Sequence, residues 1–230
     1  MNPLPTHADW LAEIPFPLAV TRWPWDMGTL ERIVAAWPGD DDPGWTSHRA
    51  GKRSYGPDGA AAPTVVQPFV ERLHSPEFVA ELSRMTGIAD LRPDPRLQGG
   101  GLHEIAPGGR LGMHVDFNML DGLVRRLNVL VYLNHDVPDI TGDLRLESDD
   151  GLSVRRVSPQ MGTMVVFGTT EASWHGHPLP LEWDHSRRSF AAYYYSPPKP
   201  GENLRQRSTV YRGEDKHKGG IGEVRAKEAT

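Results

Sequence analysis

The sequence predicts a mainly β-sheet protein with flanking α-helices and a jelly-roll core, and three observations lead to this fold class. The chain has 24 glycines and 21 prolines in 230 residues, which argues against a helical bundle and favours short strands joined by many turns. Hydrophobic residues make up 38% and charged residues 24%, as in an ordinary globular protein. After Gly87 the chain alternates apolar and polar residues in eight short runs, which is typical of a β-sandwich or barrel.

A chain of this length fits one large domain, so we expect a single domain over residues 1–230. Within it we expect N-terminal helices and a lid-like loop packed on the barrel in residues 1–97, and the β-sheet core in residues 98–196. Residues 197–230 begin with two prolines and end in a charged, glycine-containing stretch. This composition is typical of a C-terminal strap followed by a frayed tail.

Three helices are predicted before the sheet. The first covers residues 27–37, with Asp26 as its cap and Pro38-Gly39 at its end, and the second covers about 65–73. The third begins at Ser75-Pro76-Glu77, where Ser75 can cap and Pro76 fits the first turn, and it stops at Gly87. Residues 39–63 have no periodicity, so we expect a long loop there, either a lid over a binding site or a surface insertion.

The sheet is predicted to contain eight strands, each bounded by Gly, Pro, Asn or Asp. They cover about residues 98–105, 110–117, 125–133, 143–147, 152–157, 162–167, 172–176 and 187–195. Every second side chain of a strand points to the same face. Polar residues spaced by two within these runs are therefore the candidates for a site inside the sheet.

The composition excludes several classes of protein. The chain has no cysteine, which excludes thiolate catalysis, cysteine-ligated zinc and iron–sulfur clusters, and leaves a metal to the ten histidines and the carboxylates. A formal charge of -5 gives no sign of a nucleic-acid or membrane partner. Prolines interrupt the first 25 residues, which lack the pattern of a signal peptide. We expect a cytoplasmic monomer or homodimer.

Two segments carry the residues of a metal site. In His114-Val115-Asp116 the first and third residues share one face of the second strand. His175 lies near the end of the seventh strand, within Ser173-Trp174-His175-Gly176-His177. Two histidines and one aspartate on a jelly-roll form the facial triad of mononuclear iron(II), which leaves three positions open for a chelating co-substrate and oxygen.

A third segment supplies a partner for an anionic co-substrate. Arg187 and Ser189 share a face of the last strand. A guanidinium with a neighbouring hydroxyl can hold a carboxylate through several hydrogen bonds. A 2-oxo acid that chelates iron through its first carboxylate and its ketone would need such a grip on its second carboxylate.

These residues resemble the 2-oxoglutarate- and Fe(II)-dependent dioxygenases, specifically the prolyl-4-hydroxylase-like branch, over about residues 75–195. The matches occur in order: Gly99-Gly100-Gly101, Pro107-Gly108-Gly109, His114-Val115-Asp116, Arg126, Tyr132-Leu133-Asn134, Gly142-Asp143-Leu144, Trp174-His175-Gly176, Arg187-Arg188-Ser189 and Tyr193-Tyr194-Tyr195. The resemblance implies a double-stranded β-helix core, also called jelly-roll or cupin-like. It further implies that His114, Asp116 and His175 bind iron and act in catalysis. Arg187, Ser189 and Tyr132 would then hold 2-oxoglutarate.

Three choices remain open in the sequence. His177 competes with His175 for the metal, and Arg188 competes with Arg187, because a one-residue slip in strand register would exchange the two arginines. Some relatives have a tyrosine that contacts 2-oxoglutarate where this chain has Ala106. His103 and Asn128 are candidates to replace that contact, and we expect Asn128 to take part in cofactor binding.

The resemblance implies an oxidoreductase that uses Fe(II), 2-oxoglutarate and O2, with ascorbate as a candidate stimulant. Such an enzyme would hydroxylate an aliphatic C–H and release succinate and CO2. A small molecule, such as an amino acid or a natural-product intermediate, is slightly favoured over a peptide as substrate, because the chain has no basic or hydrophobic groove signature. The alternatives are a peptidyl-prolyl 4-hydroxylase acting on a protein, a non-catalytic cupin-like metal- or ligand-binding protein, and a zinc hydrolase.

Overall fold

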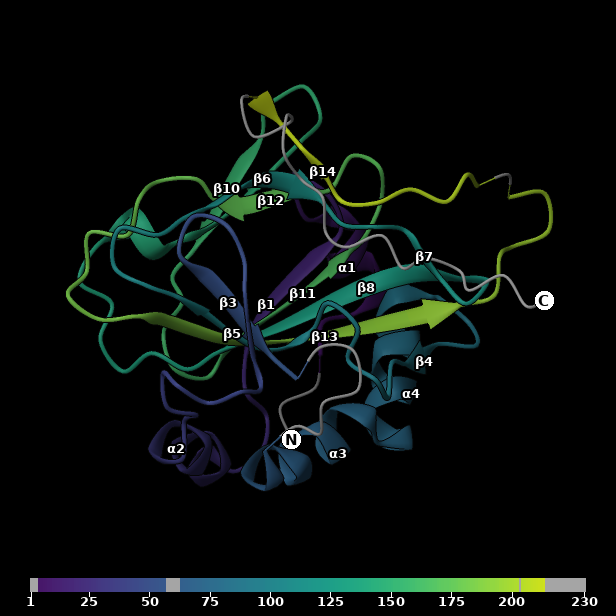
Figure 1. Cartoon of the computed structure of the whole chain (residues 1–230). Coiled ribbons are helices and arrows are strands. Elements are labelled where there is room, and N and C mark those ends of the chain that lie inside the picture. Colours follow the sequence, from purple (N-terminus) through teal and green to yellow (C-terminus); the bar gives the residue numbers. More distant parts are fainter. Residues whose placement is uncertain (1–3, 57–62, 203, 214–230) are drawn as a thin grey trace, which may run out of the picture.

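The computed structural model describes residues 4–56, 63–202 and 204–213. Within them, two antiparallel β-sheets face each other, and a layer of helices lies against the outer face of the larger sheet (Figure 1). The mainly β fold with a jelly-roll core that the sequence predicts is confirmed.

The predicted helices are present close to their expected bounds. They are α2 (Met27–Ala35), α3 (Gln67–His74), preceded by a 3-10 turn over Thr64–Val66, and α4 (Pro76–Thr86), and a short helix α1 (His7–Ala12) precedes them. The Asp26 side chain accepts a hydrogen bond from the Gly28 amide, and Ser75 accepts one from the Phe78 amide. Gly87 ends α4 in the left-handed conformation, with φ of 69°.

The larger sheet has the strand order β1-β11-β8-β13-β5-β3-β2 among the described residues, with β4 beside β13 and β7 beside β8. Its strands are β1 (Leu18–Arg22), β2 (Trp45–Ser47), β3 (Lys52–Tyr55), β4 (Arg92–Pro93), β5 (Gly101–Ile105), β7 (Met119–Leu120), β8 (Leu123–Tyr132), β11 (Thr163–Gly168) and β13 (Arg187–Ser196). The long strands β8 and β13 pair through eight residues and form its centre.

The smaller sheet has the order β10-β9-β12-β6-β14. Its strands are β6 (Leu111–Val115), β9 (Leu144–Glu147), β10 (Val154–Val157), β12 (Trp174–His177) and β14 (Val210–Tyr211), and a 3-10 turn over Ile140–Gly142 precedes β9. All eight strands expected from the sequence are therefore present.

The N-terminal part departs from the sequence prediction, because it supplies strands as well as helices. Residues 39–63, expected as an irregular loop, contain the hairpin β2–β3, which extends the larger sheet at β5, although residues 57–62 lie outside the described part. The strand β1 pairs with β11 at the opposite edge. Each of these strands is short and polar or follows prolines, so its conformation depends on the neighbouring strand rather than on its own pattern.

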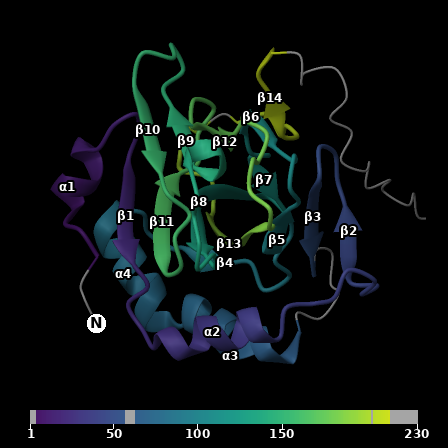
Figure 2. The same cartoon turned by 90° about the vertical axis from the view of Figure 1, so that its left-hand side faces the viewer.

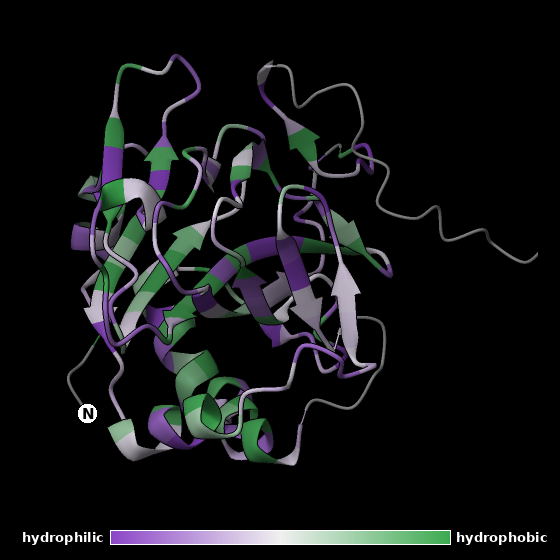
Figure 3. Cartoon of the chain, turned by 60° about the vertical axis from the view of Figure 1, so that its left-hand side comes forward, coloured by the Kyte–Doolittle hydropathy of each residue, from purple (hydrophilic) through white to green (hydrophobic). Residues whose placement is uncertain are grey.

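Two apolar clusters hold the layers together. The first joins the outer face of β8, β11 and β13 to the helices, through residues such as Leu30, Phe69, Phe78, Val129 and Phe190. Figure 2 shows α2 and α3 beneath the strands, and Figure 3 shows hydrophobic residues, in green, on the helices of this layer. The second cluster lies between the two sheets. It occupies only part of that space, and the remainder is a cavity.

The C-terminal segment returns across the smaller sheet. Arg126 forms a bidentate ion pair with Glu202 at 2.6 Å, and β14 then pairs with β6 beside the predicted metal ligands. The expected tail, residues 214–230, lies outside the described residues. In the described part of the chain, the helices are too short or too polar to cross a bilayer.

Candidate active site

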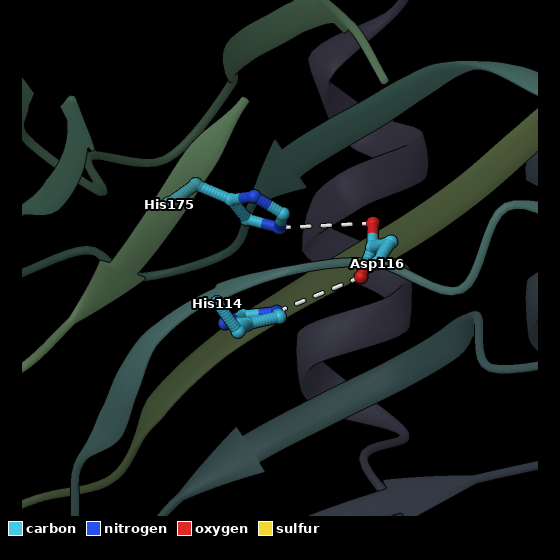
Figure 4. Close-up of side chains that lie close together, drawn as sticks. All are labelled: His114, Asp116 and His175. Atoms are coloured by element: carbon cyan, nitrogen blue, oxygen red, sulfur yellow. Dashed lines mark ion pairs between the residues drawn. The ribbon is translucent and has the colours of Figure 1, made fainter. Parts of the chain in front are cut away.

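The structure brings His114, Asp116 and His175 together between the two sheets. His114 lies on β6 and His175 directly opposite on β12, in antiparallel register. Asp116 follows the end of β6, and its two carboxylate oxygens lie 3.6 Å from Nε2 of His114 and 3.7 Å from Nε2 of His175 (Figure 4). One ligand atom from each residue lies within 4.8 Å of the others, and all three side chains are buried.

Hydrogen bonds to the backbone orient both imidazoles in the same way. Nδ1 of His114 lies 2.9 Å from the carbonyl of Gly112, and Nδ1 of His175 lies 2.9 Å from the carbonyl of Ser173. A carbonyl can only accept, so each Nδ1 carries the proton and donates it. Nε2 of each ring is therefore a free lone pair directed towards Asp116, which is the arrangement of metal-binding histidines.

The charges around the three residues keep them in the state that binds a cation. Burial raises the pKa of Asp116, but His175, His114 and the guanidinium of Arg125 outweigh this effect and hold the pKa well below its usual value. Burial, with a contribution from His114, lowers the pKa of His175 to about 4. Near neutral pH the cluster therefore presents the neutral imidazole of His175 and the carboxylate of Asp116, which together with Nε2 of His114 fit Fe(II) or a similar divalent ion.

Arg125 restrains the carboxylate from behind. Its guanidinium lies 3.4 Å from Oδ2 of Asp116 and donates to the hydroxyl of Tyr195 at 2.9 Å. The rings of Phe117 and Tyr193 enclose it on both sides, at 3.5 and 3.6 Å from the ring centroids. This buried cation offsets the charge of Asp116 and fixes its position. The family resemblance in the sequence includes the neighbouring Arg126, but Arg126 binds the C-terminal segment through Glu202 instead.

The three residues open onto a cavity of about 1550 Å³ between the sheets. The predicted co-substrate residues Arg187, Ser189 and Asn128 line the same cavity. Asn128 donates to Oδ2 of Asp116 at 3.3 Å, and its own side-chain oxygen has no hydrogen-bond partner among the described residues. It therefore lies at the metal end of the cavity rather than beside Arg187.

Arg187 is oriented by two neighbours. Its Nε donates to the carbonyl of Gly142 at 2.7 Å, and its guanidinium lies 4.9 Å from the ring centroid of Tyr132. Ser189 is directly opposite Tyr132 in the β8–β13 ladder, so the two share a face. Tyr132 is fully buried under this group and does not line the cavity, and its hydroxyl is without a hydrogen-bond partner in the described part of the chain.

Arg188 lies on the opposite face of β13, outside the cavity. Its Nε donates to Glu104 at 3.2 Å, and its guanidinium lies 4.8 Å from the ring centroid of Trp37. Trp37 and Arg53 also donate to Glu104. Of the two neighbouring arginines, Arg187 is thus the one available to a molecule in the cavity.

His177 lies in the cavity wall beyond His175 and outside the ligand cluster. The pairing of β12 with β6 shifts between these two residues, so His177 is opposite Leu111 instead of a residue nearer the metal. Both ring nitrogens of His177, and Nε2 of His103 on β5, are buried without a hydrogen-bond partner among the described residues. These atoms leave the cavity with polar groups that a ligand could satisfy.

Sequence reasoning missed several cations around this cavity, among them Lys52, Arg125 and Arg207. Lys52 belongs to the hairpin that was expected as a loop. Arg207 donates to the backbone carbonyl of Asp116 at 2.7 Å from the C-terminal segment, where residue pattern carries no signal. Arg125 begins a predicted strand next to Arg126, and two charged residues at the start of a largely apolar run were the signal that could have identified it.

Comparisons with known proteins agree with this site. Residues 100–195 match the model of the 2OG-Fe(II) oxygenase superfamily. No curated protein matches the sequence at a significant level.

Several solved structures share the fold at low sequence identity. A prolyl-4-hydroxylase from Pseudomonas putida is 19% identical with a TM-score of 0.58, covering 83% of this chain and 97% of its own. A prolyl hydroxylase from Trichoplax adhaerens, in complex with a peptide of hypoxia-inducible factor, is 13% identical with a TM-score of 0.60, covering 83% and 88%. HygX from Streptomyces hygroscopicus, with nickel, 2-oxoglutarate and hygromycin B bound, is 18% identical with a TM-score of 0.52, covering 78% and 82%.

The family model covers the segment from β5 to β13, which contains both histidines, the aspartate and the cavity arginine. The geometry of these residues fits a divalent metal, and the cavity beside them fits an anionic chelator. Residues 100–195 therefore match the 2OG-Fe(II) oxygenase superfamily, and this match supports a dioxygenase that depends on Fe(II), 2-oxoglutarate and O2.

Proposed function

We propose that the protein hydroxylates an aliphatic C–H of a small molecule, with His114, Asp116 and His175 holding Fe(II). The observation that carries this proposal is the shared cavity: the three ligand side chains and Arg187 line one continuous space. A co-substrate could therefore chelate the metal with one end and bind the guanidinium of Arg187 with the other. Arg187, Ser189, Tyr132 and Asn128 are proposed as the co-substrate residues.

Each group has a distinct part in the reaction. Fe(II) held by His114, Asp116 and His175 would, together with 2-oxoglutarate, supply the activation of O2, with release of succinate and CO2 and conversion of a substrate C–H to C–OH. Asp116 lowers the charge of the metal site from 2+ to 1+ and leaves a demand for an anionic ligand. Because Nδ1 of each histidine is committed to a backbone carbonyl, the imidazoles stay neutral ligands throughout.

Arg187 and its neighbours position the co-substrate. The bond from Nε to the Gly142 carbonyl commits that nitrogen, so the terminal nitrogens remain for a carboxylate. Ser189 adds a hydroxyl donor on the same strand face. The lining of the cavity also includes the apolar side chains of Leu130 and Leu144, which limit water beside them.

The walls of the cavity favour a small substrate over a protein. Besides the two sheets, its lining includes residues 46–50 of the β2–β3 hairpin, 119–121 after the metal site, and 206–209 of the C-terminal segment. A site walled by three separate segments suits a compact molecule, and its volume accommodates 2-oxoglutarate together with a sizeable substrate. Similar folds hold hygromycin B in one case and a peptide in another, so fold alone does not choose between them.

The proposal is tested by succinate formation in the presence of Fe(II), 2-oxoglutarate and O2, over two matched panels. One panel contains amino acids and small natural products, and the other contains proline-containing peptides. We expect a small molecule to raise succinate formation, and mass spectrometry to show a gain of one oxygen atom in that compound. Stimulation by the peptide panel alone would favour the alternative, a peptidyl-prolyl 4-hydroxylase. Asp116→Ala serves as the inactive control. The cytoplasmic location and the monomer or homodimer expected from the sequence stay predictions.

A further inference from the structure

Lys52 is a cation in the wall of the cavity that also holds Arg187. It is the first residue of β3 and is paired with Ile105 of β5. Its side chain lines the same cavity as Arg187, His103 and His177. The adjacent Arg53 points to the other face of the strand, where it binds Glu104 and Asp40. The alternation along β3 therefore directs one cation outward and the other inward.

Within the described residues, the ammonium of Lys52 has neither a hydrogen-bond acceptor nor an ion-pair partner. Burial is the main reason that the pKa of Lys52 is lowered, and Arg187 lowers it further, while Asp116 opposes both. A cation that has lost part of its hydration and faces a second cation is unfavourable without an anion beside it. Asp116 offsets only part of this effect, so a bound anion would stabilise the charge further.

The lining of the cavity places Lys52 along the path that a co-substrate would occupy. Lys52 shares this lining with Asp116 at the metal end and with Arg187 on β13. His177 and His114 line the same cavity, so these side chains surround one volume. Nε2 of His103 and both ring nitrogens of His177 are buried here without partners in the described part of the chain. Buried polar atoms in this state are typical of a site that a polar ligand completes.

We propose that Lys52 binds a carboxylate of 2-oxoglutarate, as a second cation beside Arg187, so that the co-substrate is held by the β2–β3 hairpin as well as by β13. This inference rests on the proposed function, because it assumes that 2-oxoglutarate spans the cavity between Asp116 and Arg187. The co-substrate carries two negative charges, and the metal site with Arg187 supplies two positive ones. Lys52 adds a third, and its ammonium can contact whichever carboxylate oxygen the guanidinium leaves free.

The test compares Lys52→Met, which removes the charge at similar length, with Lys52→Arg, which keeps it. Lys199→Met, the same substitution at an exposed lysine after β13, is the matched control. The dissociation constant of 2-oxoglutarate is measured anaerobically on the Fe(II)-loaded protein by the visible charge-transfer band that Fe(II) forms with 2-oxo acids. We expect Lys52→Met to weaken 2-oxoglutarate binding by about 10- to 100-fold, Lys52→Arg to recover most of the affinity, and Lys199→Met to leave it unchanged.

A second readout separates binding from folding. Without 2-oxoglutarate, Lys52→Met should unfold at the same temperature as the wild type or higher, because it removes an uncompensated cation. With saturating 2-oxoglutarate the wild type should gain more stability than the variant. An unchanged dissociation constant in Lys52→Met overturns the inference while the proposed function stands. So does a variant that loses stability and Fe(II) affinity together, which would make Lys52 structural. If the wild type itself binds no 2-oxoglutarate, the proposed function fails with it.

Discussion

Replacing Arg187 by Met should abolish tight binding of 2-oxoglutarate while the metal site survives. Arg187 is buried, lines the cavity and donates from Nε to the Gly142 carbonyl at 2.7 Å. Met has a similar length and keeps the apolar contact with Tyr132, but it has no donor. The variant therefore removes the terminal nitrogens that remain for a carboxylate and changes little else at the metal.

The size of the effect follows from the bonds that are lost. A hydrogen bond to a charged group contributes about 1.5 to 3 kcal/mol, and a guanidinium can make two of them to one carboxylate. Allowing for partial replacement by water, we expect a loss of about 3 to 4 kcal/mol, or roughly 100- to 1000-fold in the dissociation constant. The carbonyl of Gly142 also loses its donor, which should lower the free energy of unfolding by about 1 to 3 kcal/mol.

Binding is measured on folded, Fe(II)-loaded protein without oxygen, and Fe(II) affinity is measured separately. Arg188→Met is the matched control, because Arg188 is the next residue and lies on the other face of β13 against Glu104 and Trp37. We expect Arg188→Met to bind 2-oxoglutarate as the wild type does. A change of less than threefold in Arg187→Met, or a larger loss in Arg188→Met, would refute the assignment of Arg187 as the carboxylate-binding arginine.

Three further predictions follow from the site and its surroundings. His175→Ala should abolish 2-oxoglutarate turnover while His177→Ala retains a measurable rate, since only His175 belongs to the ligand cluster. Steady-state succinate formation measures both rates. The opposite result would make His177 the ligand. The metal-free protein should lose stability as the pH falls from 7.5 to 5.5, because burial lowers the pKa of His103, His175 and His177 in the folded state while the unfolded chain takes up their protons, at up to about 1.4 kcal/mol each. Urea midpoints that do not fall over this range would contradict the prediction. Gly176→Ala should weaken Fe(II) binding and lower the free energy of unfolding by about 1 to 3 kcal/mol, because its Cβ would lie 2.7 Å from backbone oxygens of Leu111 and Gly112 on the strand that carries His114. Gly39→Ala is the control, because no atom lies within 4 Å of the added Cβ. Equal metal affinity in both variants would count against the argument.

The elements of the fold that are visible in the sequence are those whose own residues determine them. The helix over Pro76–Thr86 has a capping serine, a first-turn proline and a terminal glycine, and each makes the contact that the sequence suggests. The core strands are apolar runs between turn residues, and all of them form. The candidate metal residues are visible for a similar reason, because a spacing of two in one strand places His114 and Asp116 together.

The elements that the sequence does not reveal depend on partners distant in the chain. The hairpin β2–β3 has the strand residues Lys-Arg-Ser-Tyr, which have no apolar alternation and are strand only because β5 offers an unpaired edge. Lys52 enters the cavity for that reason alone. The position of Arg207 near Asp116 likewise requires the C-terminal segment to return over β6. Pairing of this kind is set by the assembled sheet and has no local signature.

The most direct test of the whole account is an anaerobic titration of the protein with one equivalent of Fe(II) and then 2-oxoglutarate, followed by admission of O2. We predict a visible charge-transfer band that saturates with 2-oxoglutarate, and its loss on admitting O2 with formation of succinate and CO2. The band should be absent in Asp116→Ala, which removes the one carboxylate between His114 and His175. A wild-type protein that gives no band and no succinate, or a variant that gives both, would contradict the account.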